Sequence, residues 1–164
     1  MTRLNAALEA AKTLLKTIDP DPEPPPAGVW LYPDEFERIR LSQLPVVLVY
    51  DELTVRERGQ HGAGRSRHRW TAVFDVLLVS GPLNNEAMLS RAKQRVAPWE
   101  EAMEELLFAN GKLLGTVDII GDGQTVGSLY TYQPRPFRYL EQLYWGVRFR
   151  IPILQTHARI MRAQ

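Results

Sequence analysis

The sequence lacks cysteine altogether and has only three histidines among 164 residues. Without cysteine, neither a disulfide framework nor a thiolate metal site can form. The histidines, His61, His68 and His157, are too scattered along the chain to indicate a zinc centre. We therefore expect no metal and no cofactor, and a fold held together by its hydrophobic core alone.

A long apolar run, a secretory signal and an internal repeat are also missing. No stretch is long enough to cross a bilayer, and the N-terminus has no apolar core followed by a small-residue cleavage site. These absences predict a soluble chain that starts near Met1 in the cytoplasm and has no membrane partner. Its 164 residues fit a single domain that buries about 70% of its accessible surface.

A clear strand pattern is present in the middle of the chain, RSRHRWTAVFDVLLVS at residues 65–80. After a basic lead-in, Trp70, Ala72, Phe74, Val76 and Leu78 fall at every second position, with Thr71, Val73, Asp75, Leu77 and Val79 between them, and the even set carries the two aromatic residues. This alternation predicts the central strand of a sheet. Its even positions should face the core, whereas its odd positions, which include Thr71 and Asp75, should face a helix edge or a neighbouring subunit.

Two amphipathic helices are expected to cover this sheet. The first has apolar residues at helical spacing, namely Leu4, Leu8, Ala11, Leu15 and Ile18. It ends at a proline-rich connector, DPDPEPPP at residues 19–26, which should be extended and stiff. The second helix has a similar stripe, namely Met88, Ala92, Val96, Trp99, Met103 and Leu106. Pro98 should split or kink this helix before it ends near Asn110.

Further strand patterns occur at residues 46–50, extended to residue 58, and at residues 143–153. A strand, a tight turn and a strand are expected at residues 116–120, 121–123 and 126–132. The polar segment GQHGAGRSRHR, residues 59–69, reads as a long loop. In the last strand Arg148 and Arg150 share a polar face, and Pro152 favours a position at the sheet edge.

These elements predict an α+β fold with an antiparallel or mixed β-sheet, covered on one face by two α-helices, and a long basic loop between two strands. The proline-rich connector at residues 19–26 follows the N-terminal helix within this single domain. The opposite face of the sheet would hold Arg148, Arg150 and Asp75, and would be wet or face another copy of the chain.

The basic loop and its flanks are the strongest candidate for a contact site. The basic residues there are Arg56, Arg58, Arg65, Arg67, His68 and Arg69, offset only by Glu57. Arginine binds phosphate well, and Trp70 could stack on a base. The alternative is a solvated loop whose arginines only keep the surface soluble.

An acidic block follows Pro98 and comprises Glu100, Glu101, Glu104 and Glu105. Because these residues occupy exposed positions near a helix start, a solvated face is a better interpretation than a paired-carboxylate catalytic site. No serine or cysteine nucleophile stands in a catalytic context, so we do not expect an enzyme. Candidates for a subunit interface are Glu100, Glu101, Glu104, Arg148 and Arg150.

The order of elements carries a resemblance to a known family. An N-terminal amphipathic helix, a long polar loop between two strands, a mid-chain helix holding Trp99 and a last strand YWGVRFRIPI follow one another. In this order, from about residue 4 to residue 153, the chain resembles the tail terminator proteins of long-tailed bacteriophages, also called tail completion or minor tail proteins. The proline-rich connector departs from the smaller members of that family.

The resemblance implies a structural virion protein, assembled in the host cytoplasm, that forms a ring, usually six-fold, on the head-proximal end of the tail tube. Such a ring ends tube polymerisation and offers a surface for joining the head. The implied partners are other copies of the chain, the tail tube protein, a head completion or connector protein, and DNA passing through the lumen.

Two alternatives stay open from the sequence. The chain could be another head–tail connector component, or a nucleic-acid-binding module that uses residues 56–69 together with Arg148 and Arg150. The sequence also leaves open whether the basic residues face the lumen, a neighbouring subunit or the connector.

Overall fold

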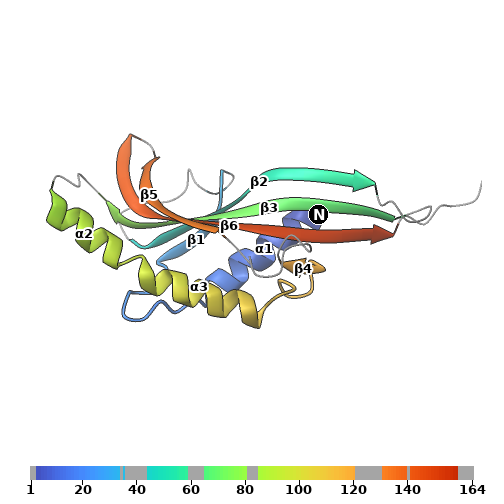
Figure 1. The fold of residues 1–164 in the computed structure, drawn as a ribbon, viewed down its shortest axis with the longest axis horizontal. Helices are drawn as coiled ribbons and strands as arrows, with labels where there is room; N and C mark the ends of the chain where they lie inside the picture. The colour runs from blue at the N-terminus through green and yellow to red at the C-terminus, as the bar shows by residue number, and fades with distance from the viewer. Residues whose placement is uncertain are drawn as a thin grey trace, which may run out of the picture.

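The computed structural model describes residues 3–33, 35, 44–58, 65–80, 85–120, 131–139 and 141–158. In chain order the elements are α1 Arg3–Leu15, β1 Gly28–Leu31, β2 Val46–Arg58, β3 Arg65–Ser80, α2 Glu86–Gln94, α3 Ala97–Ala109, β4 Ile119–Ile120, β5 Thr131–Tyr139 and β6 Gln142–Ala158. They form the expected α+β fold, in which α1 and the joined helices α2 and α3 pack on a mixed sheet (Figure 1). The turn expected at residues 121–123 lies outside the described residues.

Strand β3 is the central strand, as the sequence predicts. The sheet has the order β1-β2-β3-β6-β4, and β5 also pairs with β6. Strands β2 and β6 both run antiparallel to β3; on the β6 side the pairing extends from Arg65 to Ser80, with a register shift between Leu77 and Val79. Strand β1 is parallel to β2, which makes the sheet mixed. This short strand was not identified from the sequence.

The main core lies on the helix-covered face and confirms the predicted alternation. The even positions of β3 are buried there, namely Trp70, Ala72, Phe74, Val76 and Leu78. From β6 the same core receives Val147, Phe149 and Ile151, and α1 contributes Ala7, Ala11 and Leu15. Two helices against one sheet face therefore bury a single continuous apolar layer.

The second helical segment breaks where the sequence predicts. Helix α2 ends at Gln94 and α3 begins at Ala97, with Pro98 in its first turn, where the missing N–H costs no hydrogen bond. The side chain of Asn85 caps α2 by accepting from the Met88 backbone N–H at 2.8 Å. The predicted apolar stripe is correct over α3 but wrong at Met88, which is exposed because α2 buries only Ala92.

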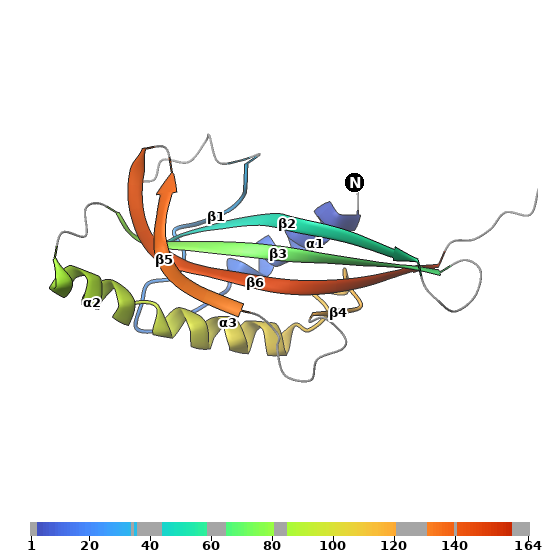
Figure 2. The ribbon, with the colours of Figure 1, turned by 45° about the horizontal axis from the view of Figure 1, so that its top comes forward.

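On the opposite face, strands β5 and β6 form a hairpin that bends away from the helices (Figure 2). A smaller core lies under this bend and comprises Val46, Leu48, Leu77, Phe137 and Tyr144. The expectation of a wet face or a face toward another copy is therefore wrong around Asp75, which is fully buried. The hairpin covers the sheet here with the same chain.

Strand β5 differs from its predicted position. Residues 131–139 pair with β6, from Thr131↔Arg150 to Tyr139↔Gln142, although the sequence pattern predicted a strand only up to residue 132. Pro134 and Pro136 concealed the remainder, because proline removes ladder donors and is tolerated at the edge of a sheet. The strand predicted at residues 116–120 is reduced to Ile119–Ile120, and it pairs with β6.

Two local predictions about proline are also corrected. Pro152 is not on an edge strand, since β6 lies between β3 and the strands β4 and β5. It stands where the β5 pairing has ended at Arg150 and the β4 pairing begins at Ile153. The connector at residues 19–26 is not extended throughout, because the Glu23 backbone N–H donates to the Pro20 carbonyl at 2.8 Å in a turn.

The long loop is shorter than the sequence predicts. Strand β2 continues to Arg58 and β3 begins at Arg65, so residues 65–69 are paired strand, and only residues 59–64, outside the described residues, separate the two strands. Three strand ends, from β2, β3 and β6, project together beyond α1, α3 and β4 (Figures 1 and 2).

Candidate functional site

The polar centre of the sheet is Asp75, at the middle of β3. Its side chain is 0% exposed, and it is registered with Leu48 of β2 and Arg148 of β6. Its odd position places it on the face away from the helices, beneath the bent β5–β6 hairpin. A carboxylate buried at this depth is stable only where hydrogen-bond donors replace water.

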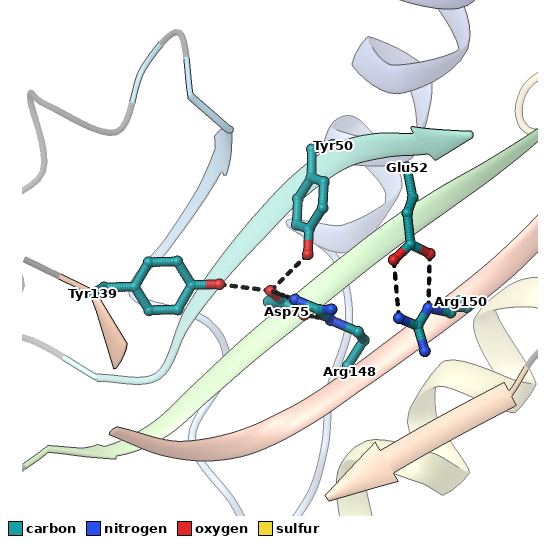
Figure 3. Close-up of polar contacts among 6 residues, drawn as sticks. All are labelled: Tyr50, Glu52, Asp75, Tyr139, Arg148 and Arg150. Carbon is teal, nitrogen blue, oxygen red and sulfur yellow. Dashed lines mark hydrogen bonds and ion pairs between the residues drawn. The ribbon is translucent and has the colours of Figure 1, made fainter. Parts of the chain in front are cut away.

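Four donor atoms surround this carboxylate (Figure 3). Arg148 binds it in a bidentate manner, with Nε 2.6 Å from Oδ1 and Nη2 2.8 Å from Oδ2. The hydroxyls of Tyr50 and Tyr139 both donate to Oδ2, at 2.9 Å and 2.6 Å. The three partners come from β2, β5 and β6, so the Asp75 cluster ties four strands together.

The electrostatics of the Asp75 cluster favour the protonated forms of its two tyrosines and its arginine. Burial, followed by the negative charge of Asp75, raises the pKa of Tyr50 and the pKa of Tyr139. The hydrogen bonds to Asp75 raise the pKa of Arg148. Because both carboxylate oxygens already accept donors and each phenol keeps its proton, the arrangement serves to position strands and does not present a free acid or base.

Aromatic rings enclose the Arg148 guanidinium. Its central carbon lies 5.7 Å from the ring centroid of Tyr50 and 5.7 Å from that of Phe137. Tyr32, just after β1, packs edge-on against Tyr50 and Tyr139, with centroid distances of 5.6 Å and 6.1 Å. The ion pair is therefore shielded from water, which strengthens it and raises the cost of losing either partner.

A second ion pair lies on the same face of the sheet and is more open. Arg150 donates from Nε and Nη2 to the two carboxylate oxygens of Glu52, at 2.7 Å and 2.9 Å (Figure 3). The hydrogen bonds from Arg150 lower the pKa of Glu52. Both side chains are more than a third exposed, 37% and 38%, so solvent screens this pair.

Two of the residues predicted for a subunit interface have partners within the same chain. Arg148 is bound inside the subunit by Asp75, and Arg150 is bound by Glu52. Arg148 is largely buried in its pair, whereas Arg150 remains 37% exposed. The sequence identified both arginines as members of a polar strand face, and the structure shows their partners within the same chain.

The predicted basic residues lie on paired strands. Arg56 and Arg58 are at the end of β2, while Arg65, Arg67, His68 and Arg69 are at the start of β3. The register is Arg56↔His68, Glu57↔Arg67 and Arg58↔Ser66. Because paired positions share a face, Arg56 and Arg58 occupy positions of one face, and Arg65, Arg67 and Arg69 occupy positions of the other face together with Glu57. We call residues 56–58 and 65–69 the basic strand end. Strand β6 continues the pairing on its other side up to Arg65↔Ala158.

The predicted acidic residues lie along α3. Glu101, Glu104 and Glu105 are exposed, and Glu100 is half-buried. Together with Phe108 and Ala109, the three exposed glutamates line an open hollow of about 580 Å³. We call Glu101, Glu104, Glu105 and Phe108 the acidic helix face. It lies on a different part of the molecule from the basic strand end.

The sequence interpretation missed the Asp75 cluster as a unit. Its signal was a lone carboxylate in an apolar strand, together with an arginine in another amphipathic strand. The two tyrosines could not be assigned because their contacts depend on how the β5–β6 hairpin bends. Within the described part of the chain, no group of three histidine, aspartate or glutamate residues is placed to hold a metal ion, and no helix is long and apolar enough to cross a membrane.

Comparison with known proteins gives no assignment for this arrangement. No model of a known protein family matches the chain, and no curated protein matches it at a significant level.

Proposed function

We propose that this chain is a structural subunit of a ring that caps the head-proximal end of a phage tail tube, ends tube polymerisation and offers the surface for joining the head. The observation that carries the proposal is the basic strand end, which is paired with the end of β6 and projects with it beyond the helical layer (Figure 1). A projection of this kind suits contact with another macromolecule better than chemistry on a small substrate.

The projection is stiff because the sheet continues through it. Five residues of β3, from Arg65 to Arg69, precede the buried Trp70; all five have registered partners in β6, and the four from Ser66 to Arg69 also have partners in β2. At about 3.3 Å for each strand residue, they extend the sheet by about 17 Å. Paired strands keep their shape under load, whereas a free loop of the same composition would have to be ordered at an entropic cost on binding.

The distribution of charge supports contact between copies of the chain. A ring requires two different complementary surfaces on each subunit, because a heterologous contact closes only when the two surfaces face in different directions. The basic strand end and the acidic helix face are oppositely charged and lie on different elements. An axial partner, such as the tail tube or the head connector, would then contact other surfaces of the ring.

A nucleic-acid-binding module is the second candidate, favoured by the five arginines of the basic strand end. Of the other arginines in that hypothesis, Arg148 pairs with Asp75 and Arg150 with Glu52 within the chain. Binding of a labelled DNA duplex, measured by fluorescence anisotropy at several salt concentrations, separates the two candidates. Salt-dependent affinity of the monomer for DNA, with no assembly, would support the module and contradict the ring.

Electron microscopy of tails tests the ring directly. The purified chain is added to the tail tube protein encoded near it while the tubes polymerise. We expect tubes of limited length with a ring at one end. Replacing Arg65, Arg67 and Arg69 by glutamate should abolish the capping or the joining of heads, with the fold intact by circular dichroism.

The matched control reverses charge elsewhere. Arg91 and Lys93 are exposed on α2, away from the basic strand end, so Arg91→Glu with Lys93→Glu should leave capping unchanged. Tubes that grow without limit in the presence of the wild-type chain would refute the proposal. Normal capping by the variant with three glutamates would show that the basic strand end is not the surface responsible.

A further inference from the structure

The outer face of α3 has features of a surface that is covered in an assembly. Helix α3 carries four glutamates and no basic residue. Glu101 and Glu105 are four residues apart, as are Glu100 and Glu104, and like charges at this spacing destabilise a helix. Among the described residues, none of these glutamates forms an ion pair that would offset the repulsion.

An aromatic side chain stands beside these carboxylates. Phe108 is 68% exposed, the most exposed of the large apolar side chains that the structure describes. It borders the same hollow as Glu101, Glu104 and Glu105. A hollow with an exposed aromatic ring and a rim of one charge is typical of a docking site for a partner of the opposite charge.

The same chain carries a surface of matching composition. The basic strand end has five arginines and one glutamate within residues 56–58 and 65–69. The two arginines of β2 and the three of β3 occupy positions of opposite sheet faces, so the strand end is basic on both faces. Arginine is enriched at protein interfaces, forms bidentate pairs with carboxylates and stacks on aromatic rings. All three of these properties suit the acidic helix face, which offers carboxylates around a phenylalanine.

Within one subunit the two surfaces do not meet. In both views the ends of β2 and β3 extend past the C-terminal end of α3 and point away from it (Figures 1 and 2). Strands β2 and β3 are paired up to Arg58↔Ser66, so the basic strand end cannot fold back onto α3 without breaking the sheet. A second copy can bring the two surfaces together.

We propose that the acidic helix face of one copy binds the basic strand end of the next copy. The contact is heterologous, so it repeats around a closed ring or along a filament. This inference rests on the ring proposed above and specifies which surfaces join its subunits. DNA, or a different acidic protein, as the partner of the basic strand end is the competing outcome.

Reversing the charge of each surface separately tests the contact. One variant carries Glu101→Lys, Glu104→Lys and Glu105→Lys, and the other carries Arg56→Glu, Arg58→Glu, Arg65→Glu and Arg67→Glu. Each variant alone presents two surfaces of like charge and should stay monomeric in sedimentation velocity experiments. An equimolar mixture restores opposite charges at every contact, so it should assemble as the wild type does.

The wild-type reference is run at about 0.05 M and about 0.5 M NaCl, because screening should weaken a contact between exposed charges. Phe108→Ala tests the apolar part of the contact and should weaken self-association by about tenfold or more, as for a central interface aromatic. Met88→Ala is the matched control, since Met88 is also exposed but lies on α2. It should leave self-association unchanged.

The outcomes separate this inference from the function proposed above. A mixture that stays monomeric while the wild type assembles would overturn the contact, and tube capping by the wild type would leave the ring proposal standing. A wild-type chain that remains monomeric at low salt and high concentration would also overturn the contact. Assembly of either charge-reversed variant alone would show that other surfaces join the copies.

Discussion

Tyr139 in β5 donates a hydrogen bond of 2.6 Å to Asp75 in β3, although 64 positions separate the two residues and β6 lies between their strands in the sheet. The bond can form only because the β5–β6 hairpin bends over the face opposite the helices (Figure 2). Asp75 thus holds the bent hairpin against the flat part of the sheet, which gives a buried carboxylate a structural role.

Replacing Asp75 by asparagine should destabilise the protein by about 3 kcal/mol, because it leaves the Arg148 guanidinium without its counter-charge in a site where that side chain is 12% exposed. Urea unfolding measures the change. Asp51→Asn is the matched control, since Asp51 is an exposed aspartate on the neighbouring strand and should change stability by less than about 0.5 kcal/mol. Equal effects of the two substitutions would contradict the role assigned to Asp75.

Alkaline pH should weaken the fold through the two phenols of the Asp75 cluster. The pKa values of Tyr50 and Tyr139 are raised above the ordinary 10.0 in the folded chain, first by burial and then by the charge of Asp75. The folded state therefore retains protons that the unfolded chain loses, so this stabilisation is complete below pH 10.0 and is lost as the pH rises above it.

Urea unfolding of the wild type and of a variant with Tyr50→Phe and Tyr139→Phe, measured between neutral and alkaline pH, checks this sign. The variant should be less stable at neutral pH, because it lacks two hydrogen bonds to a charged group, each worth about 1.5 to 3 kcal/mol. The difference in the free energy of unfolding between the wild type and the variant should become smaller above pH 10.0. If this difference stayed constant with pH, the two phenols would have the same pKa in the folded and the unfolded chain, which would contradict the prediction.

Arg148 and Arg150 should differ sharply in their contribution to stability, although only one residue separates them on β6. Arg148→Ala leaves the carboxylate of Asp75 buried without a cation and should cost about 3 kcal/mol or more. Arg150→Ala breaks an exposed pair with Glu52 and should cost less than about 1 kcal/mol. Thermal and urea unfolding of the two variants measure the difference, and similar losses would contradict the described burial.

Gly146 should tolerate no side chain. It lies on β6 opposite Leu77, beside a register shift between β3 and β6, and a Cβ atom there would overlap the backbone carbonyl oxygen of Val76. We expect Gly146→Ala to cost about 3 kcal/mol through displaced backbone. Gly111→Ala is the control, because nothing lies within 4 Å of the added Cβ and stability should barely change. The comparison is made by thermal unfolding.

The alternation of apolar and polar residues along the sequence predicted some of the strands and missed others. The alternation in residues 70–78 identified the core face of β3 correctly, because side chains on successive residues of a strand point to opposite faces. The alternation predicted for residues 143–153 is correct for Val147, Phe149 and Ile151 but wrong at Leu143, which is exposed. Strand β5 escaped detection beyond residue 132, since its two prolines are tolerated only through its place at the sheet edge. That place is a property of the whole sheet.

The candidate site was predicted in part. The positions of the arginines and glutamates were evident, but their partners were not. Arg148 and Arg150 looked alike in sequence, and the structure pairs one with a buried carboxylate and the other with an exposed one. The basic residues looked like a mobile loop because arginine and glycine dominate there, whereas pairing with β2 and β6 makes residues 65–69 a strand.

The sequence by itself determined the fold class, the central strand, the two amphipathic helices and the break before Pro98, because each depends on spacing and propensity within a few neighbouring residues. Only the tertiary structure decided that Asp75 is buried and bound, that the hairpin bends over it and that the basic residues lie on paired strand ends. These outcomes join residues far apart in the chain, and their energies come from burial and geometry that no local pattern contains.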